Sequence, residues 1–321
     1  MPNLYCSTFD QNYLARALVL YESVVSNNDS AVFVFCCIDD ISVELLKKLA
    51  LPRSIILSLE CYASLELTAV RPLRAYGEFC WTCKPVAQKF LMNRYPEFDW
   101  IVYLDADMMC FGDPDLGLPG NAYDYVLTPH RFHIHQKGYE KSVGIYNGGY
   151  VAARNSRQGQ QVIDFWERKC LESCSAVPSE YVYGDQKYLN YFAQEVDGCF
   201  ISENKGLNAA PWNILNYNVS HLLGDVYLDS TRLLIYHFQG FKVYSNGRAS
   251  LYTGDWVVPR HIATYIYGPY VDALHKAYCG LGKLAPYFSG GIYPKPRGRY
   301  GFISTALSWI RMFPNIVNIN K

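Results

Sequence analysis

The chain has no net charge and no long apolar run. Its 321 residues carry 29 Lys and Arg against 29 Asp and Glu, which excludes a generally basic nucleic-acid-binding protein. The longest apolar run, 31–38, is far shorter than the roughly 20 residues that a membrane-spanning helix needs. The start of the chain lacks a basic stretch followed by an apolar one, so we expect no secretory signal.

Charged residues are few, whereas aromatic residues and cysteines are many. Charged residues make up 18% of the chain and aromatic residues 16%, a composition that excludes a disordered protein. The eleven cysteines are odd in number and belong to a chain too long to need a disulfide framework, so we expect a reducing, cytoplasmic setting. Cys80 and Cys83 have the C-x-x-C spacing, but no strand is predicted before them and no second pair is suitably spaced, which disfavours a redox or zinc site.

Acidic side chains are missing from the end of the chain. None follows Asp272, whereas seven Lys and Arg do, so residues 1–272 hold 22 positive and 29 negative charges. We therefore expect a main domain over 1–255 and a small basic, aromatic C-terminal appendage over 256–321. Within it, apolar residues from Phe302 to Phe313 fall on one helical face behind a basic stretch. Such a helix either contacts an anionic membrane peripherally or packs on the main domain.

Apolar patterning predicts an α/β fold. The predicted strands and helices alternate, which favours a sheet with parallel strands and helices on its faces. Pro85 is expected in the first turn of its helix, and Ser42 as the cap of the helix that follows it. Strands are predicted over 4–8, 31–38, 100–104, 123–128, 145–152 and 233–237, and helices over 13–25, 42–49, 82–95, 160–171 and 185–192.

Two carboxylates follow the strand predicted over 100–104. Asp105 and Asp107 lie where ligands bind in open α/β sheets, beyond the carboxyl end of a parallel strand. Alternate residues of an extended segment point the same way, so both can reach one site while Ala106 points into the fold. Their repulsion needs a cation, and carboxylates suit Mg²⁺ or Mn²⁺. A cation that bridges to a diphosphate is our interpretation; a solvated turn is the alternative.

These residues lie in a longer pattern. The segment 103–107, YLDAD, resembles the metal-binding D-x-D segment of the GT-A glycosyltransferases, especially glycosyltransferase family 8 and its bacterial relatives. The resemblance implies a GT-A fold, which is a Rossmann-like mixed sheet flanked by helices. Further similar segments occur in the same order: 7–10 (STFD) with Tyr13, 146–151 (YNGGYV), 184–190 (GDQKYLN) and 237–242 (HFQGFK).

The resemblance also implies roles for individual residues. His237 would be the third ligand of the cation, and it ends a predicted strand before Gly240, which would let a phosphate approach the backbone. Lys242 would meet the diphosphate, although Val243 stands where the family commonly has proline. The donor would also contact Thr8, Asp10, Tyr13, Lys84, Asp105 and Ala106, and the catalytic side would hold Asp185, Gln186 and Asn147, in a turn-forming Asn-Gly-Gly.

Several of these residues also have simpler interpretations. A lone His after an apolar strand is commonly packed and hydrogen-bonded. Asn-Gly-Gly forms tight turns or bulges in many proteins. Asp185 and Gln186 are expected to open the helix over 185–192, and in the simpler interpretation the carboxylate does no more than cap that helix.

The implied function is metal-dependent glycosyl transfer. The donor would be a nucleotide sugar, most simply a UDP-sugar with Mn²⁺ or Mg²⁺, and the acceptor a glycan or glycolipid in bacterial surface polysaccharide or lipopolysaccharide synthesis at the cytoplasmic face. The resemblance to family 8, whose members retain the anomeric configuration, favours retention, because the Asp185-Gln186 pair fits that pattern better than a dedicated base does. A sugar nucleotidyltransferase and a catalytically inactive GT-A carbohydrate-binding module are the alternatives.

Overall fold

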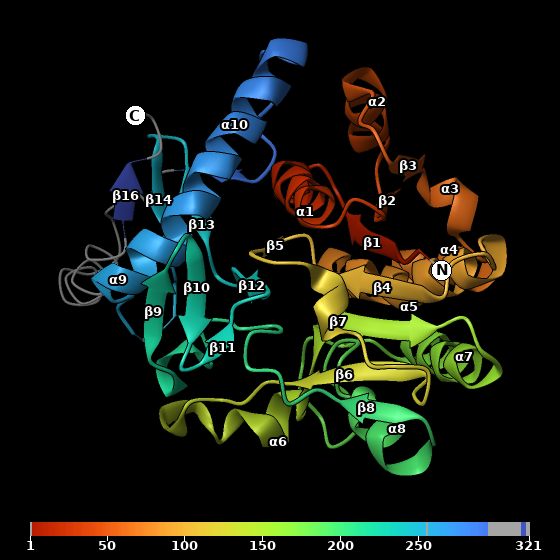
Figure 1. The fold of residues 1–321 in the computed structure, drawn as a ribbon. Helices are drawn as coiled ribbons and strands as arrows, with labels where there is room; N and C mark the ends of the chain where they lie inside the picture. The colour runs from red at the N-terminus through yellow and green to blue at the C-terminus, as the bar shows by residue number, and fades with distance from the viewer. Residues whose placement is uncertain (1, 255, 295–315, 319–321) are drawn as a thin grey trace.

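The chain folds around one mixed sheet. The computed structural model describes residues 2–254, 256–294 and 316–318. Its main sheet has seven strands in the order β3-β2-β1-β4-β7-β6-β8 (Figure 1). The first four run parallel, and β7 is antiparallel to both neighbours. The strands are β1 Leu4–Phe9, β2 Val32–Cys37, β3 Ser54–Leu57, β4 Trp100–Leu104, β6 Tyr125–Pro129, β7 Tyr146–Arg154 and β8 Cys199–Ile201.

Both faces of this sheet are buried, because successive side chains of its strands enter different core clusters. In β4, Val102 and Leu104 pack into one cluster, and Ile101 and Tyr103 into the other. A strand buried on both sides reads as a continuous apolar run. The sequence run 31–38, which contains β2, has this character.

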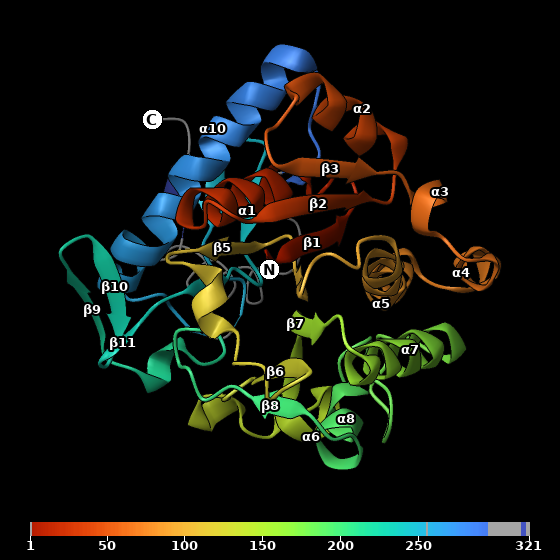
Figure 2. The ribbon, with the colours of Figure 1, turned by 45° about the vertical axis from the view of Figure 1, so that its right-hand side comes forward.

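Helices cover both faces. Helices α1 and α10 lie on one side of the main sheet and α5 and α7 on the other (Figure 2). The helices of four or more residues are α1 Leu14–Asn27, α2 Asp40–Leu49, α3 Leu59–Tyr62, α4 Leu65–Val70, α5 Tyr76–Arg94, α6 Tyr139–Val143, α7 Arg157–Glu172, α8 Leu189–Glu195 and α10 Gly268–Leu284, joined to α9 Arg260–Ile262 by the π-helical turn η5 Ala263–Tyr267. This arrangement confirms the predicted α/β, GT-A-type fold.

Smaller sheets surround this core. Strand β5 Met108–Cys110 pairs with β12 Ile235–His237, and β9 Val219–Leu222, β10 Asp225–Leu228 and β11 Thr231–Arg232 form a meander. The last sheet has the order β15-β13-β14-β16, with β13 Lys242–Tyr244, β14 Arg248–Ser250, β15 Ile292–Tyr293 and β16 Ile316–Asn318. Short 3-10 helices are η1 Arg71–Leu73, η2 Pro114–Gly117, η3 Ile134–Gln136 and η4 Ile214–Asn216.

The described part of the predicted C-terminal appendage packs on the main core. Tyr270 of α10 stacks on Phe238 with ring centroids 3.6 Å apart, and Leu274 and Leu281 are buried in the same cluster as α1. The boundary at residue 255 stays a prediction. The apolar helical face predicted from Phe302 to Phe313 lies outside the described residues.

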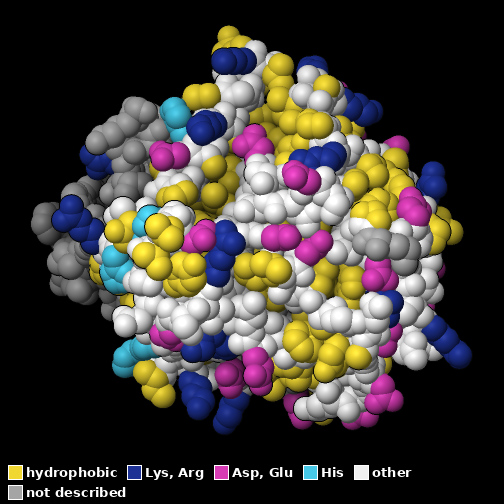
Figure 3. All heavy atoms as spheres, viewed as in Figure 1, with side chains coloured by type: hydrophobic (Ala, Val, Ile, Leu, Met, Phe, Trp, Pro, Cys, Tyr) yellow, Lys and Arg dark blue, Asp and Glu magenta, His cyan; other side chains and the backbone are white. Residues whose placement is uncertain are grey.

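The surface agrees with the charge balance of the sequence. Lys and Arg side chains are interspersed with Asp and Glu over the face seen in Figure 3. Among the described residues, none of the helices combines the length and apolar character that crossing a membrane requires. All eleven cysteines are free thiols in the structure.

Three local expectations about helices are wrong. Asp39 caps α2, because its carboxylate accepts from the Ser42 backbone N–H at 2.7 Å. Pro85 lies inside α5, which begins at Tyr76. Asp185 does not open a helix: it lies in a turn before α8, and its carbonyl accepts from the Trp166 indole N–H at 2.7 Å rather than from a following helical N–H.

Candidate active site

The two predicted carboxylates lie together at the end of a buried strand. Strand β4 ends at Leu104, and the Asp105 backbone N–H donates to the Gly149 carbonyl of β7 at 2.8 Å. The Met108 N–H then donates to the Asp105 carbonyl at 3.0 Å, which turns the chain into β5. Asp105 and Asp107 line one cavity, and Ala106, although it is almost completely buried, also lies at its wall.

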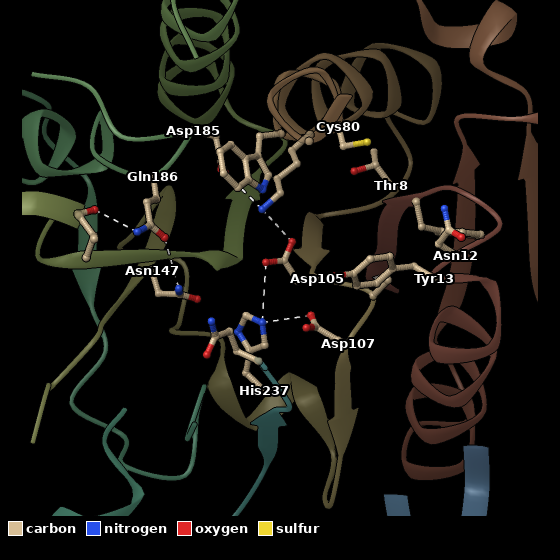
Figure 4. A pocket seen from close by; sticks show the side chains of 18 of the residues that line it. Thr8, Asn12, Tyr13, Cys80, Asp105, Asp107, Asn147, Asp185, Gln186 and His237 are labelled. Atoms are coloured by element: carbon tan, nitrogen blue, oxygen red, sulfur yellow. Dashed lines mark hydrogen bonds and ion pairs between the residues drawn. The ribbon is translucent and has the colours of Figure 1, made fainter. Parts of the chain in front are cut away.

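Pairing of β5 with β12 carries a histidine to the same point. His237 lies opposite Met108 in this antiparallel pair. Its Nε2 is 3.1 Å from Asp107 Oδ1 and 3.9 Å from Asp105 Oδ2 (Figure 4). Burial lowers the pKa of His237, but the neighbouring Asp107 and Asp105 outweigh it and raise the pKa above its ordinary value.

These three side chains fit a divalent cation. Each offers one ligand atom, and the three atoms all lie within 4.8 Å of one another. Two carboxylates and an imidazole suit Mn²⁺ or Mg²⁺. The buried Nδ1 of His237 has no hydrogen-bond partner among the described residues, so no protein group at Nδ1 sets the tautomer of the ring.

A buried lysine links this cluster to the catalytic side of the cavity. Lys84 of α5 places its Nζ 2.8 Å from Asp105 Oδ1 and 3.4 Å from Asp185 Oδ2. The Tyr103 hydroxyl also donates to Asp105 Oδ1 at 3.1 Å. Burial raises the pKa of Asp185 to about 6 although Lys84 opposes the shift. Lys84 is therefore a fixed positive charge between two carboxylates.

The segment of Asn147 is part of a strand rather than a turn. It lies in β7, and the Asn147 amide is held on both sides. Its Oδ1 accepts from the Gly149 N–H at 2.9 Å and from Asn208 Nδ2 at 3.0 Å. Its Nδ2 lies 3.4 Å from Gln186 Oε1 and 3.3 Å from His130 Nε2. These bonds fix one orientation of the amide at the cavity.

Glycine is required beside Asn147 because the site is tightly packed. A Cβ on Gly149 would lie 2.7 Å from Asn147 Oδ1 and 2.8 Å from the His237 ring, and a Cβ on Gly148 would lie 2.6 Å from Asp185 Oδ2. The glycines therefore allow β7 to pass directly under the ligand and catalytic side chains.

The predicted nucleotide residues line the opposite side of the cavity. Thr8 Oγ1 lies 3.1 Å from the Tyr103 hydroxyl. The Asp10 carboxylate accepts from the backbone and side-chain N–H groups of Asn12 at 3.1 and 2.7 Å. Tyr13 is 37% exposed. Thr8 lies within β1, and Asp10 and Tyr13 follow this strand. Thr8 and Tyr13 lie to one side of the cation ligands, whereas Asn147 and Gln186 lie to the other (Figure 4).

Two predicted residues do not line this cavity in the structure. Gly240 has a φ of +80° and follows Gln239, which does line the cavity. Lys242 begins β13, and its Nζ lies over the Tyr293 ring, 5.3 Å from the centroid. Their roles toward a diphosphate stay predictions.

The cavity has a volume of about 950 Å³ and contains residues that the sequence did not indicate. His130 and the fully buried Asn208 both contact the Asn147 side chain. A single Asn belongs to no sequence motif, so its role could not be predicted. The aromatic lining comes from separate loops and helices, so no local pattern reveals it. Its members include Tyr76, Trp81, Phe132, Tyr139, Tyr183, Trp212, Tyr252 and Tyr293.

Comparisons with known proteins agree with this fold. Residues 5–116 match the family described as glycosyl transferase family 8. The chain is 26% identical to the uncharacterized protein YfnD of Bacillus subtilis (strain 168) over 299 residues, which is 92% of this chain and 96% of YfnD. It is 29% identical to YfnF of the same organism over 258 residues, 76% of this chain and 84% of YfnF.

Solved structures share the fold at low sequence identity. The galactosyltransferase LgtC, in complex with donor and acceptor sugar analogues, has a TM-score of 0.52 at 17% identity, covering 74% of this chain and 87% of LgtC. The apo form of the glycosyltransferase GlyE of Streptococcus pneumoniae TIGR4 has a TM-score of 0.50 at 14% identity, covering 88% of this chain and 63% of GlyE.

Proposed function

We propose that the chain, which has the GT-A fold and matches glycosyl transferase family 8 over residues 5–116, transfers a sugar from a nucleotide-diphosphate donor in a metal-dependent reaction. The observation that carries this proposal is the convergence of Asp105, Asp107 and His237 within 4.8 Å at the wall of one large cavity. A UDP-sugar with Mn²⁺ or Mg²⁺ is the donor that we propose.

The chain's own groups have distinct tasks in this reaction. A divalent cation held by the three ligands would supply Lewis-acid stabilisation of the departing diphosphate. Lys84 holds Asp105 in place through the 2.8 Å ion pair and adds a fixed positive charge that favours an anionic donor. Asn147 and Gln186 line the cavity beside the Asp185 carboxylate, where the donor sugar would bind.

The carboxylates of the cavity favour retention of configuration. An inverting enzyme needs a carboxylate base at the acceptor hydroxyl. Among the described residues that line the cavity, the carboxylates belong to Asp10, Asp105, Asp107 and Asp185. Two of these are proposed ligands, Asp10 is bonded to Asn12 on the nucleotide side, and Asp185 is paired with Lys84. None is available as a base at the acceptor.

The acceptor is proposed to be a glycan or glycolipid. The similar fold of LgtC, which binds an acceptor sugar analogue, supports a carbohydrate acceptor in the same cavity, and the aromatic lining suits the apolar faces of sugar rings. We propose surface polysaccharide or lipopolysaccharide synthesis as the setting, at the inner face of the cytoplasmic membrane with the basic C-terminal segment in peripheral contact.

The test is a panel of nucleotide sugars incubated with the full chain, with and without Mn²⁺. We expect Mn²⁺-dependent release of nucleoside diphosphate from one donor, abolished in Asp107→Ala and unchanged in Asp29→Ala, an exposed control. Normal turnover by Asp107→Ala would overturn the proposed site. Pyrophosphate formation from a sugar phosphate and a nucleoside triphosphate would instead identify a nucleotidyltransferase, and binding without any turnover an inactive carbohydrate-binding module.

A further inference from the structure

The cavity has three parts in a line, and their order matches the parts of a nucleotide sugar. The cation ligands Asp105, Asp107 and His237 lie in the middle, with Asn147 on one side and Tyr13 on the other (Figure 4). A nucleotide sugar carries its diphosphate between the sugar and the nucleoside. On the proposed function, the amide side takes the sugar, and the side of Tyr13 takes the nucleoside.

We infer that Tyr293 is a further nucleoside-contacting residue, supplied to the donor site by the C-terminal segment 290–294. Gly291 to Pro294 of this segment line the same cavity as Thr8, Asp10 and Tyr13. The Tyr293 side chain is 38% exposed, so part of it is free to meet a ligand. A residue far along the chain thereby completes a wall that begins with the loop after β1.

Two glycines fix this segment against that loop. A Cβ on Gly290 would lie 2.2 Å from the Gln11 carbonyl oxygen, and a Cβ on Gly291 would lie 2.2 Å from that of Asn12. Gly291 also has a φ of +75°, which disfavours other residues. Its N–H faces Asn12 Oδ1 at 3.4 Å. The backbone of the segment 290–294 therefore packs directly on the backbone of the loop after β1, and this contact sets the distance between Tyr293 and that loop.

Strand pairing and a cation hold Tyr293 from the other side. Strand β15 pairs in parallel with β13, with Tyr293 opposite Tyr244. The Lys242 ammonium lies 5.3 Å from the centre of the Tyr293 ring, within cation–π range. Burial raises the pKa of the Tyr13 hydroxyl, and the nearby Asp107 and Tyr293 raise it further, which agrees with Tyr13 and Tyr293 sharing one end of the cavity.

The chemistry of this end suits a planar aromatic ligand. Tyr13 and Tyr293 are both part-exposed tyrosines beside a proposed diphosphate position, and base–aromatic stacking does not depend on which base is present. Tyr293 should therefore strengthen binding of the nucleoside and leave binding of the diphosphate itself unchanged.

The experiment compares two probes that differ only by the nucleoside. Isothermal titration calorimetry of the full chain with Mn²⁺ measures binding of UDP and of inorganic pyrophosphate. Tyr293→Ala should weaken UDP binding about tenfold, as expected for loss of one stacking contact, and leave pyrophosphate binding unchanged. Tyr293→Phe should retain UDP affinity. Tyr287→Ala is the matched control, because Tyr287 belongs to the same C-terminal region but is 98% exposed.

A second variant tests the placement of the segment. Gly291→Ala should reproduce the loss of UDP affinity because its Cβ collides with the backbone of Asn12, whereas Gly282→Ala, which meets nothing within 4 Å, should not. Equal UDP affinity in Tyr293→Ala and the wild type would overturn the inference while leaving the proposed function intact. An equal loss for both probes would also overturn it, since Lys242 and not the ring would then be responsible. A wild-type chain that binds neither probe would overturn the proposed function and this inference with it.

Discussion

Lys84 should stabilise the metal-free protein more than any surface ion pair of the same helix. Its Nζ lies 2.8 Å from Asp105 and 3.4 Å from Asp185, and its side chain is only 8% exposed. The substitution Lys84→Met keeps the length of the side chain and removes the charge. Asp105 and Asp185 then lose the positive charge between them, and the Asp185 side chain is only 5% exposed.

The size of the effect follows from burial. Removing one partner of a buried ion pair costs about 3–5 kcal/mol, because an uncompensated charge stays behind. Asp185 already has its pKa raised to about 6 by burial, so without Lys84 it can take up a proton at neutral pH and limit the cost. We therefore expect a loss of about 3 kcal/mol in the free energy of unfolding, at the lower end of that range.

The assay is urea denaturation at neutral pH, with a chelator and with saturating Mn²⁺. The control is Lys89→Met on the same helix, where Lys89 is 37% exposed and pairs with Asp164 and Glu167 at 3.0 and 2.6 Å; a pair this exposed contributes less than about 1 kcal/mol. Mn²⁺ should restore more stability to Lys84→Met than to the wild type, because the ion neutralises Asp105. Equal losses in the two variants would refute the reasoning.

Two further predictions concern the residues around Asn147. Burial lowers the pKa of His130 to about 4, so between pH 6.5 and 4 the unfolded chain binds a proton that the folded chain does not, and stability falls as the pH drops through this window. His130→Gln should remove up to about 3 kcal/mol of that fall. Urea denaturation at the two ends of the window checks this, and the same loss of stability in His130→Gln and the wild type would contradict it. Gly149→Ala should lower Mn²⁺ affinity at least about tenfold, because its Cβ would lie 2.8 Å from the His237 ring and displace this ligand at a cost above about 1.4 kcal/mol. Calorimetric titration with Mn²⁺ checks this, and Gly280→Ala, whose Cβ meets nothing within 4 Å, is the control.

The sequence predicted the centre of the site well, for a physical reason. Residues at i and i+2 after a strand share a direction, so Asp105 and Asp107 could be placed together from spacing alone. The parallel order of the first strands also followed from continuous apolar runs such as 31–38, which match strands buried on both faces. His237 was reached through the family resemblance, and the pairing of β5 with β12 shows how the fold brings it to the carboxylates.

Other parts of the site depend on contacts that spacing does not encode. Asp185 has a favourable residue type for a helix start, but the tertiary hydrogen bond from Trp166 holds it in a turn. Asn208 joins Asn147 across 61 residues of sequence. Tyr293 reaches the cavity only because two glycines let its segment touch the loop after β1.

Electron paramagnetic resonance of Mn²⁺ in the presence of UDP tests the central claim most directly. If Asp105, Asp107 and His237 hold a cation that binds the donor diphosphate, the wild-type chain should bind one Mn²⁺ whose spectrum changes when UDP is added. Asp107→Asn should lose the signal of this bound Mn²⁺ while its circular dichroism spectrum shows that the fold is kept. An unaltered signal in Asp107→Asn would contradict the account.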